Sequence, residues 1–175
     1  MVYIVKKVQG ILMDIEKLLN ILEDNARISN KDIALMLNET EETVASKIKE
    51  LEDSKVIAGY HTVINRNNGC KEEVSAVIEV NSTPERENGY DRVANMICKY
   101  PEVKSMYLIS GRTEFLVLVT GETMNDIANF VGSKLAPMDG VKGTSTVFVL
   151  KNYKKDGIIF ENEDEKQQER LFVSV

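Results

Sequence analysis

The spacing of apolar residues changes once along this chain, and this change constrains the fold more than any other feature. Up to Leu51 apolar residues recur at intervals of three and four, as in the segment from Ile11 to Asn25, which is the spacing of helices with one buried face. From Val74 to Val80 they alternate, which is typical of a half-buried strand. Between the two parts, residues 65–69 are turn formers without apolar anchors. The sequence therefore predicts a helical domain followed by a separate domain that contains strands.

Three helices are predicted in the first domain. The first spans 11–25, Asn30 is expected to cap a short second helix, and Thr40 to cap a third that runs to Asp53. Val56–Ile64 is apolar and β-branched enough to form a strand. A short second helix, a tight turn and a third helix form the pattern of a helix-turn-helix, whose third helix enters a major groove. A generic three-helix bundle has the same periodicity.

The second domain is predicted to be α+β, with four strands and two helices. Strands are expected over 73–80, 103–109, 115–119 and 142–150, and helices over 88–100 and 123–135. The resulting order β-α-β-β-α-β is that of the ferredoxin-like split βαβ sandwich, one antiparallel sheet with both helices on one face. Because the other face would expose apolar positions, we expect two sheets to pair across a two-fold axis in at least a dimer.

The composition weakens several classes of function. The chain has 22 Lys and Arg against 28 Asp and Glu, a net charge of -6, which argues against a basic nucleic-acid-binding surface. Cys70 and Cys98 alone predict neither a disulfide framework nor a zinc site, and the single histidine, His61, has no triad spacing. No apolar run is long enough to span a bilayer and no signal peptide is recognisable, so we expect a cytoplasmic protein without a membrane partner.

A series of landmarks along residues 12–151 resembles the Lrp/AsnC (feast/famine) family of transcriptional regulators. The landmarks are Leu19-x-x-Leu22, Ala26-Arg27-Ile28-Ser29-Asn30, Ile33-Ala34, Lys47-Ile48-Lys49-x-Leu51-Glu52, Val56-Ile57-x-Gly59-Tyr60, Ser110-Gly111-x-x-Glu114-Phe115-Leu116 and Gly140-Val141 with Thr144-x-Thr146. The resemblance implies a winged helix-turn-helix domain over 1–64. It further implies a ferredoxin-like (RAM-type) effector-sensing and oligomerisation domain over 65–151 and a C-terminal extension over 152–175.

The resemblance also implies that the third helix binds double-stranded DNA, in a dimer or octamer. The implied DNA-contacting residues are Thr40, Glu42, Thr43, Ser46, Lys47 and Lys49. The lysines suit phosphates, the hydroxyls suit base edges, and Glu42 suits a cytosine amino group. The favoured explanation of Glu41 and Glu42, however, is that they are first-turn partners of the helix dipole. From Thr40 to Asp53 five acids face two bases, a net charge of -3. We therefore expect weak affinity per half-site, which oligomerisation recovers.

The second half resembles the family's sensor, which binds an amino acid or related metabolite between protomers. The implied effector-binding residues are Gly111, Arg112, Thr113, Glu114, Thr144 and Thr146. Exposed amides and an acid suit a zwitterion, but a purely structural hairpin explains the same residues. No cofactor or metal and no catalytic residue is expected. Two alternatives remain: a sirohaem-decarboxylase-like enzyme of the same architecture, and a metabolite-binding oligomer that has lost DNA binding.

The C-terminal extension carries two apolar triplets around an acidic stretch. These are Ile158-Ile159-Phe160 and Leu171-Phe172-Val173. They are able to pair as an extra hairpin or to add strands to a neighbouring protomer's sheet edge; simple disorder is the competing interpretation.

Overall fold

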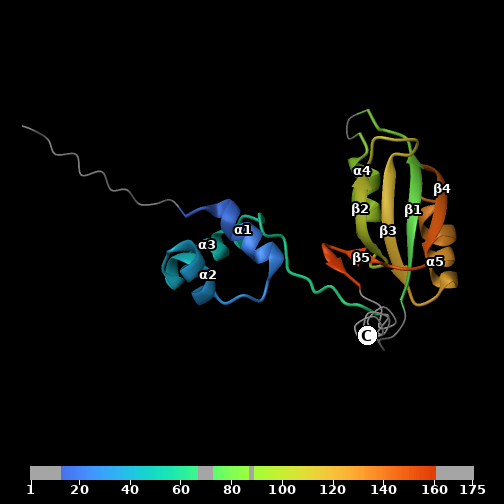
Figure 1. Ribbon diagram of the computed structural model, residues 1–175. Coiled ribbons are helices and arrows are strands. Elements are labelled where there is room, and N and C mark those ends of the chain that lie inside the picture. Colours follow the sequence, from blue (N-terminus) through green and yellow to red (C-terminus); the bar gives the residue numbers. More distant parts are fainter. Residues whose placement is uncertain (1–12, 67–72, 87–88, 161–175) are drawn as a thin grey trace, which may run out of the picture. The chain divides into compact units, whose positions relative to one another are not determined.

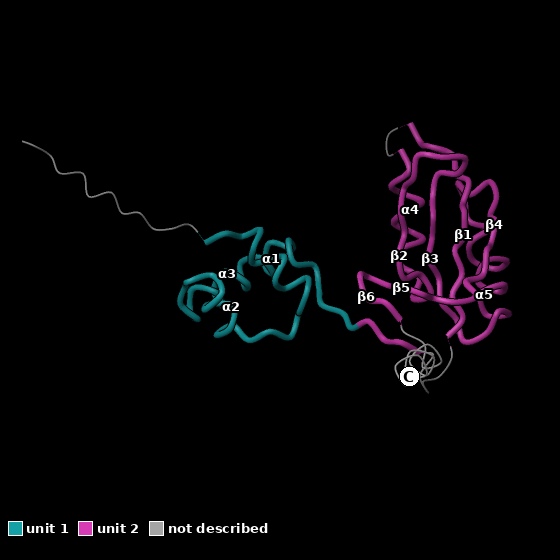
Figure 2. The backbone as a smooth tube through the Cα atoms, viewed as in Figure 1, with its two compact units in different colours: residues 1–62 teal, residues 63–175 magenta. Residues whose placement is uncertain are grey.

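The computed structural model describes residues 13–66, 73–86 and 89–160 of the chain. The chain divides into two units, Met1–Thr62 and Val63–Val175, shown in separate colours in Figure 2. Each unit has its own apolar core. The two are therefore described one at a time.

Three helices make up the described part of the first unit: α1 (Ile15–Asp24), α2 (Asn30–Leu37) and α3 (Glu41–Asp53). Their apolar stripes meet in a core that consists of Leu18, Leu22, Ile33, Ala34, Val44 and Leu51. The expected helix-turn-helix arrangement is thus formed. Its second helix is capped by Ser29 instead of Asn30, because the Ser29 side chain accepts a hydrogen bond from the Asp32 amide at 3.1 Å, whereas Asn30 is already helical.

The segment after α3 differs from the prediction. Val56–Ile64 was expected to be a strand, but within the described stretch 13–66 it forms none. The amide of Ile57 instead donates to the Leu51 carbonyl at 3.0 Å, which terminates α3, and the Ile57 side chain packs on the helical core. A strand requires a hydrogen-bonded neighbour, and the described part of this unit supplies none, so the wing expected from the resemblance is not formed there.

The second unit contains a four-stranded antiparallel sheet in the order β2-β3-β1-β4. The strands are β1 (Val74–Ser82), β2 (Val103–Leu108), β3 (Phe115–Gly121) and β4 (Val141–Val149). The helices are α4 (Asp91–Ile97) and α5 (Met124–Phe130), and α5 continues directly into a π-helical segment, η1 (Val131–Leu135). Figure 1 shows α4 and α5 on the same side of the sheet. The predicted β-α-β-β-α-β order and sandwich are confirmed.

Alternation along the strands separates a buried face from an open face. On β1, Ala76, Ile78 and Val80 are fully buried beneath the helices, while the residues between them are half-buried on the other face. The register places further apolar side chains on that other face: Tyr107, Leu116, Leu118, Val77, Val147 and Val149. We call this set the open face. Among the described residues no helix layer covers it, and Val147 is 59% exposed.

A short hairpin follows the sheet. Strand β5 (Lys154–Lys155) pairs with β6 (Ile158–Ile159) through Asp156 and Gly157, which both have positive φ. Positive φ at both central residues is the geometry of a type I′ turn, for which Asp-Gly is a favoured sequence. A hairpin is therefore formed in which Ile158–Ile159 pairs with Lys154–Lys155. The pairing of the two apolar triplets is a separate prediction, because Leu171–Val173 lies outside the described residues.

Candidate functional site

The turn between α2 and α3 fixes how the third helix begins. Asn38 adopts a left-handed conformation with φ 56 and ψ 44, and the Glu39 amide bonds back to the Ala34 carbonyl at 2.9 Å. Such a left-handed residue is a common way to end a helix. Two residues later the Thr40 hydroxyl accepts from the Thr43 amide at 3.2 Å, and the two hydroxyls are 2.8 Å apart. Thr40 is therefore committed to capping α3, as the sequence indicated.

Most of the predicted DNA-contacting side chains lie on the outer side of α3. Since successive residues of a helix turn by about 100°, Glu42, Ser46 and Lys49 share one side of the helix, and all three are exposed, as is Thr43. Val44 is fully buried on the opposite side, as expected for the residue that anchors the helix to its bundle.

Lys47 occupies a different environment from Lys49. Its side chain is only 24% exposed, and its Nζ donates to both carboxylate oxygens of Glu50 at 2.9 and 2.8 Å. The two side chains stand three residues apart on adjacent turns, a spacing at which opposite charges attract. Lys47 is thus paired with Glu50, whereas Lys49 forms no ion pair with any residue that the structure describes.

At one end of the sheet, two of the predicted effector residues lie beside the last residues of β1. The Ser82 amide donates to Glu114 Oε2 at 2.8 Å, so one oxygen of this carboxylate already holds the strand end. Thr144 pairs with Val80, and Val80 pairs with Phe115, which places Thr144 and Phe115 two strand spacings apart, or about 10 Å. The structure therefore brings Glu114 and Thr144 to the same end of the sheet, on either side of β1.

The remaining predicted effector residues differ in their exposure. Gly111 and Arg112 are exposed in the connection from β2 to β3, and Thr113 is half-buried. Thr146 lies two residues further along β4, opposite Ile78. Thr144 and Thr146 pair with the buried Val80 and Ile78 and are half-buried, so they lie on the helix-covered side of the sheet, whereas Gly111 and Arg112 are exposed.

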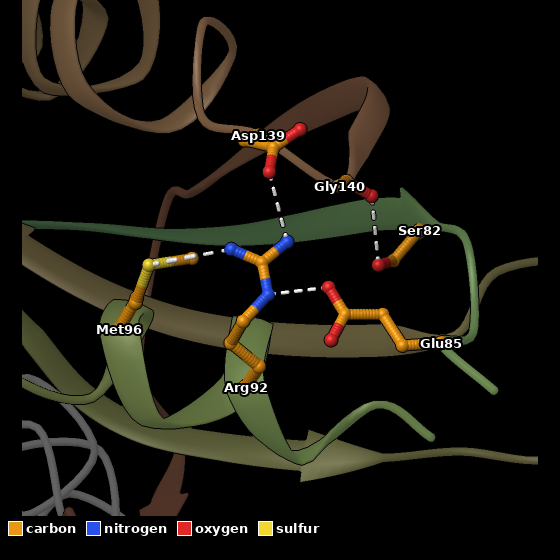
Figure 3. A network of polar contacts seen from close by, with 6 residues as sticks. All are labelled: Ser82, Glu85, Arg92, Met96, Asp139 and Gly140. Carbon is orange, nitrogen blue, oxygen red and sulfur yellow. Dashed lines mark hydrogen bonds and ion pairs between the residues drawn. The ribbon is translucent and has the colours of Figure 1, made fainter. Parts of the chain in front are cut away.

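A polar network that the sequence did not indicate closes the same end of the sheet (Figure 3). Arg92, at the start of α4, pairs with Glu85 through Nε and with Asp139 through Nη2 at 3.0 Å. Ser82 Oγ donates to the Gly140 carbonyl at 2.9 Å. The hydrogen bond to Glu85 above all raises the pKa of the Arg92 guanidinium further, so it stays charged. The only local signal in the sequence was the turn at 137–140, which did not reveal these partners.

The described residues contain neither a metal-ligand cluster nor a membrane-spanning helix. Among residues 13–66, 73–86 and 89–160, no group of three or more His, Cys, Asp and Glu side chains is arranged to hold a metal ion. No helix in the described part of the chain is long and apolar enough to cross a membrane.

Comparison with protein families matches both units. The AsnC-type helix-turn-helix domain matches residues 15–52, and the Lrp/AsnC ligand binding domain matches residues 75–159. The HTH-type transcriptional regulator YugG of Bacillus subtilis, itself uncharacterized, is 40% identical over 159 residues, which cover 90% of this chain and 95% of that protein. The chain belongs to the Lrp/AsnC family of transcriptional regulators.

Other members of the Lrp/AsnC family are similar over most of their length. The regulator FL11 of Pyrococcus furiosus is 29% identical and is covered to 95%, against 84% of this chain. The NMB0573–L-Met complex of Neisseria meningitidis has a TM-score of 0.61 at 26% identity, covering 79% of this chain and 89% of that one. The feast or famine regulatory protein of M. tuberculosis, with a TM-score of 0.64 at 20% identity over 81% of this chain and 92% of that one, supports the fold alone. These relatives are named as regulators, not as enzymes of the sirohaem type.

Proposed function

We propose that this member of the Lrp/AsnC family is a dimeric or larger DNA-binding regulator whose α3 helices read paired half-sites. The observation that carries the proposal is α3 itself, held by the Thr40 cap on one side and by Val44 in the core, with Ser46 and Lys49 exposed on its outer side. A helix fixed in this way presents its first turns to a major groove without further rearrangement. Ser46 is suited to base edges and Lys49 to phosphate.

The test is a pull-down of genomic DNA fragments with the purified full chain at moderate salt. Enrichment of specific fragments is expected for the natural protein and is expected to disappear when Lys47 and Lys49 are both replaced by Glu. The matched control replaces Lys142 and Lys151 by Glu, because both are exposed in the second unit and the change in net charge is the same. If the control loses enrichment equally, the loss is caused by the change in net charge and not by α3.

A metabolite-binding oligomer that has lost DNA binding is the second candidate, and one observation favours it. The outer side of α3 carries exposed Glu42, Glu50 and Asp53 against exposed Lys49, and Lys47 is already paired. Carboxylates near phosphates oppose association. If the natural protein enriches no fragment in the pull-down while still binding a metabolite, this second candidate replaces the first.

We further propose that an amino acid or a related metabolite binds at the end of the sheet, between protomers. The support is the family's ligand binding domain over 75–159, the L-Met complex of the neisserial relative, and the end of the sheet shared by Glu114 and Thr144, with Gly111 and Arg112 exposed in the adjoining connection. Backbone amides and hydroxyls suit a carboxylate, and the cation of Arg112 adds attraction for an anion. Because Glu114 Oε2 already holds the Ser82 amide, its second oxygen is the acceptor for the ligand's ammonium.

The effector test is calorimetric titration of the full chain with the common amino acids, starting with L-methionine. Heat of binding is expected for at least one. Thr144→Val keeps the shape but removes the hydroxyl, and is expected to weaken that binding about fivefold to tenfold, as for one lost hydrogen bond. Thr62→Val, at an exposed position of the first unit, is the control. No heat for any amino acid would contradict the proposal.

A further inference from the structure

A pocket of about 420 Å³ lies in the helix layer of the second unit, on residues that neither the DNA nor the effector proposal uses. Its walls come from the end of α4 and from η1 with the turn that follows. The lining residues are Met96, Lys99, Tyr100, Lys134, Pro137 and Met138. Ligand pockets in proteins commonly have volumes of about 300–1,000 Å³, so the size suits a small molecule.

The side chain of Lys134 is fixed at one wall of this pocket. Its Nζ is 2.6 Å from Glu102 Oε1 and lies 5.5 Å from the centre of the Tyr100 ring and 5.8 Å from that of Phe130. The ion pair balances the charge of Lys134. Glu102 Oε2, on the same carboxylate, is buried and has no hydrogen-bond partner among the described residues.

Lys134 belongs to a turn of unusual geometry. In η1 the Ala136 amide bonds to the Val131 carbonyl at 2.8 Å, five residues back. π-helical turns are rare and occur frequently at functional sites. Here the widened turn sets Lys134 against Tyr100 and Glu102 instead of continuing the spacing of α5.

Lys99 gives the pocket a positive charge that nothing in the described part of the chain balances. It is exposed, and it forms no ion pair with any described residue. The other walls are apolar: the ring of Pro137 and the thioethers of Met96 and Met138, whose flexible side chains adapt to a ligand. A cation beside apolar walls suits a ligand that combines a negative head group with an apolar body.

We propose that this pocket is a second ligand site of the protein and binds a small organic anion with an apolar body. Lys99 pairs with the head group, while the two methionines and Pro137 cover the apolar part. The site is separate from the proposed effector site. Lys99 and Tyr100 precede β2, whereas Gly111 follows it, and the five steps of the strand alone span about 17 Å.

The two methionines of the pocket allow a direct test by NMR, because methyl resonances of methionine are observable even in a large oligomer. The full chain is labelled with ¹³C at the methionine methyl groups, and hexanoate is titrated while the methyl resonances are recorded. Saturable shifts are expected at Met96 and Met138, whereas Met36 and Met124, which lie outside the pocket, are expected to stay unchanged. Hexanamide has the same apolar chain without the charge and is expected to bind about fivefold more weakly or not at all.

The variant Lys99→Met is expected to weaken hexanoate binding about fivefold, since it removes the cation but keeps an apolar chain of similar length. Lys142→Met removes an exposed lysine of β4 and is the matched control, with no expected change. Lys134 is left intact because its ion pair with Glu102 supports the fold. The proposal is overturned if neither methyl group shifts saturably, if hexanamide binds as well as hexanoate, or if the two lysine variants lose affinity equally.

Discussion

Single charged side chains at the two candidate sites are largely engaged within the chain itself. Lys47 is held by Glu50, and Glu114 holds the amide of Ser82. A cation that is already paired must weaken that contact before it neutralises a phosphate, whereas a carboxylate that holds one amide keeps its second oxygen for a ligand. At the residue scale, intramolecular competition is thus expected to limit binding at α3.

The first prediction tests this competition on α3. Replacing Glu50 by Gln frees Lys47 and removes an acid from the exposed side of the helix, so affinity for an enriched DNA fragment is expected to rise about threefold to tenfold. If Lys47 then contacts one more phosphate, the logarithm of affinity should fall more steeply with the logarithm of salt concentration, by about 0.9. Both quantities are measurable by fluorescence anisotropy over a salt series. Glu23→Gln on α1 is the control, and unchanged affinity in Glu50→Gln would contradict the competition.

The second prediction concerns Glu102 and acid. The hydrogen bond from Lys134 holds the pKa of Glu102 below its ordinary value of 4.5. A lowered folded-state pKa contributes stability above the unfolded value, and this contribution is lost as the pH falls through the folded value. Glu102→Gln is therefore expected to reduce the free energy of unfolding by about 1 kcal/mol at neutral pH, with the difference shrinking once the pH falls below about 4.

Urea unfolding followed by tyrosine fluorescence is the measurement, because Tyr90, Tyr100 and Tyr107 lie in the second unit. Natural protein and variant are compared at neutral pH and at successively lower pH. A difference that stays constant into strong acid would mean that the charge of Glu102 is not the cause.

At the element scale, most of the architecture was predictable and the exceptions have physical reasons. Apolar periodicity indicates which face of an element is buried, so it located the helix that contains Val44 and the strand that contains Ile78. It cannot separate an α-helix from a π-helical turn, and a single helix was predicted where η1 follows α5. Nor does it show whether a strand has a neighbour, which is why a strand was wrongly predicted over Val56–Ile64. The Asp156-Gly157 turn was readable from the sequence and was overlooked.

The candidate sites were less predictable than the fold. The position of Thr40 as a cap followed from local chemistry. The partners of Arg92 and Lys134 could not be predicted, because they come from segments far apart in the sequence that only the folded sheet brings together. The exposed side of α3 could be inferred from its period, but the pairing of Lys47 with Glu50 depends on side-chain conformation.

The third prediction tests the connection that carries η1 into β4. Gly140 has φ +93, and a methyl group built there would lie 2.7 Å from Val93 Cγ2. Gly140→Ala combines backbone strain with a clash in the core, and is expected to cost about 2–4 kcal/mol of unfolding free energy. Gly132→Ala has open space around the new methyl group and is expected to be neutral or slightly stabilising. Urea unfolding of both variants gives the comparison, and equal stabilities would refute the strained geometry.

At the scale of the whole molecule, the sheet has one apolar surface that no other layer covers in the described part of the chain, the open face. Tyr107 and Val147 are 56% and 59% exposed, and Leu116, Leu118 and Val77 lie between them on the same face. An antiparallel sheet with one uncovered apolar face gains stability by burying that face against another layer. A second copy presents the same surface, so a two-fold pair of sheets covers both faces at once.

The last prediction links this pairing to DNA binding. Leu118→Glu places a charge at the centre of the open face, and is expected to reduce the solution mass to the 19.7 kDa of one chain. Two linked recognition helices raise effective concentration, so affinity for a fragment with two half-sites is expected to fall at least about a hundredfold in the monomer. Met124→Glu, an exposed position at the start of α5, is the control for mass and affinity. Analytical ultracentrifugation and anisotropy separate the outcomes: an unchanged mass excludes the open face as the interface, whereas a reduced mass with unchanged affinity shows that each α3 binds DNA alone.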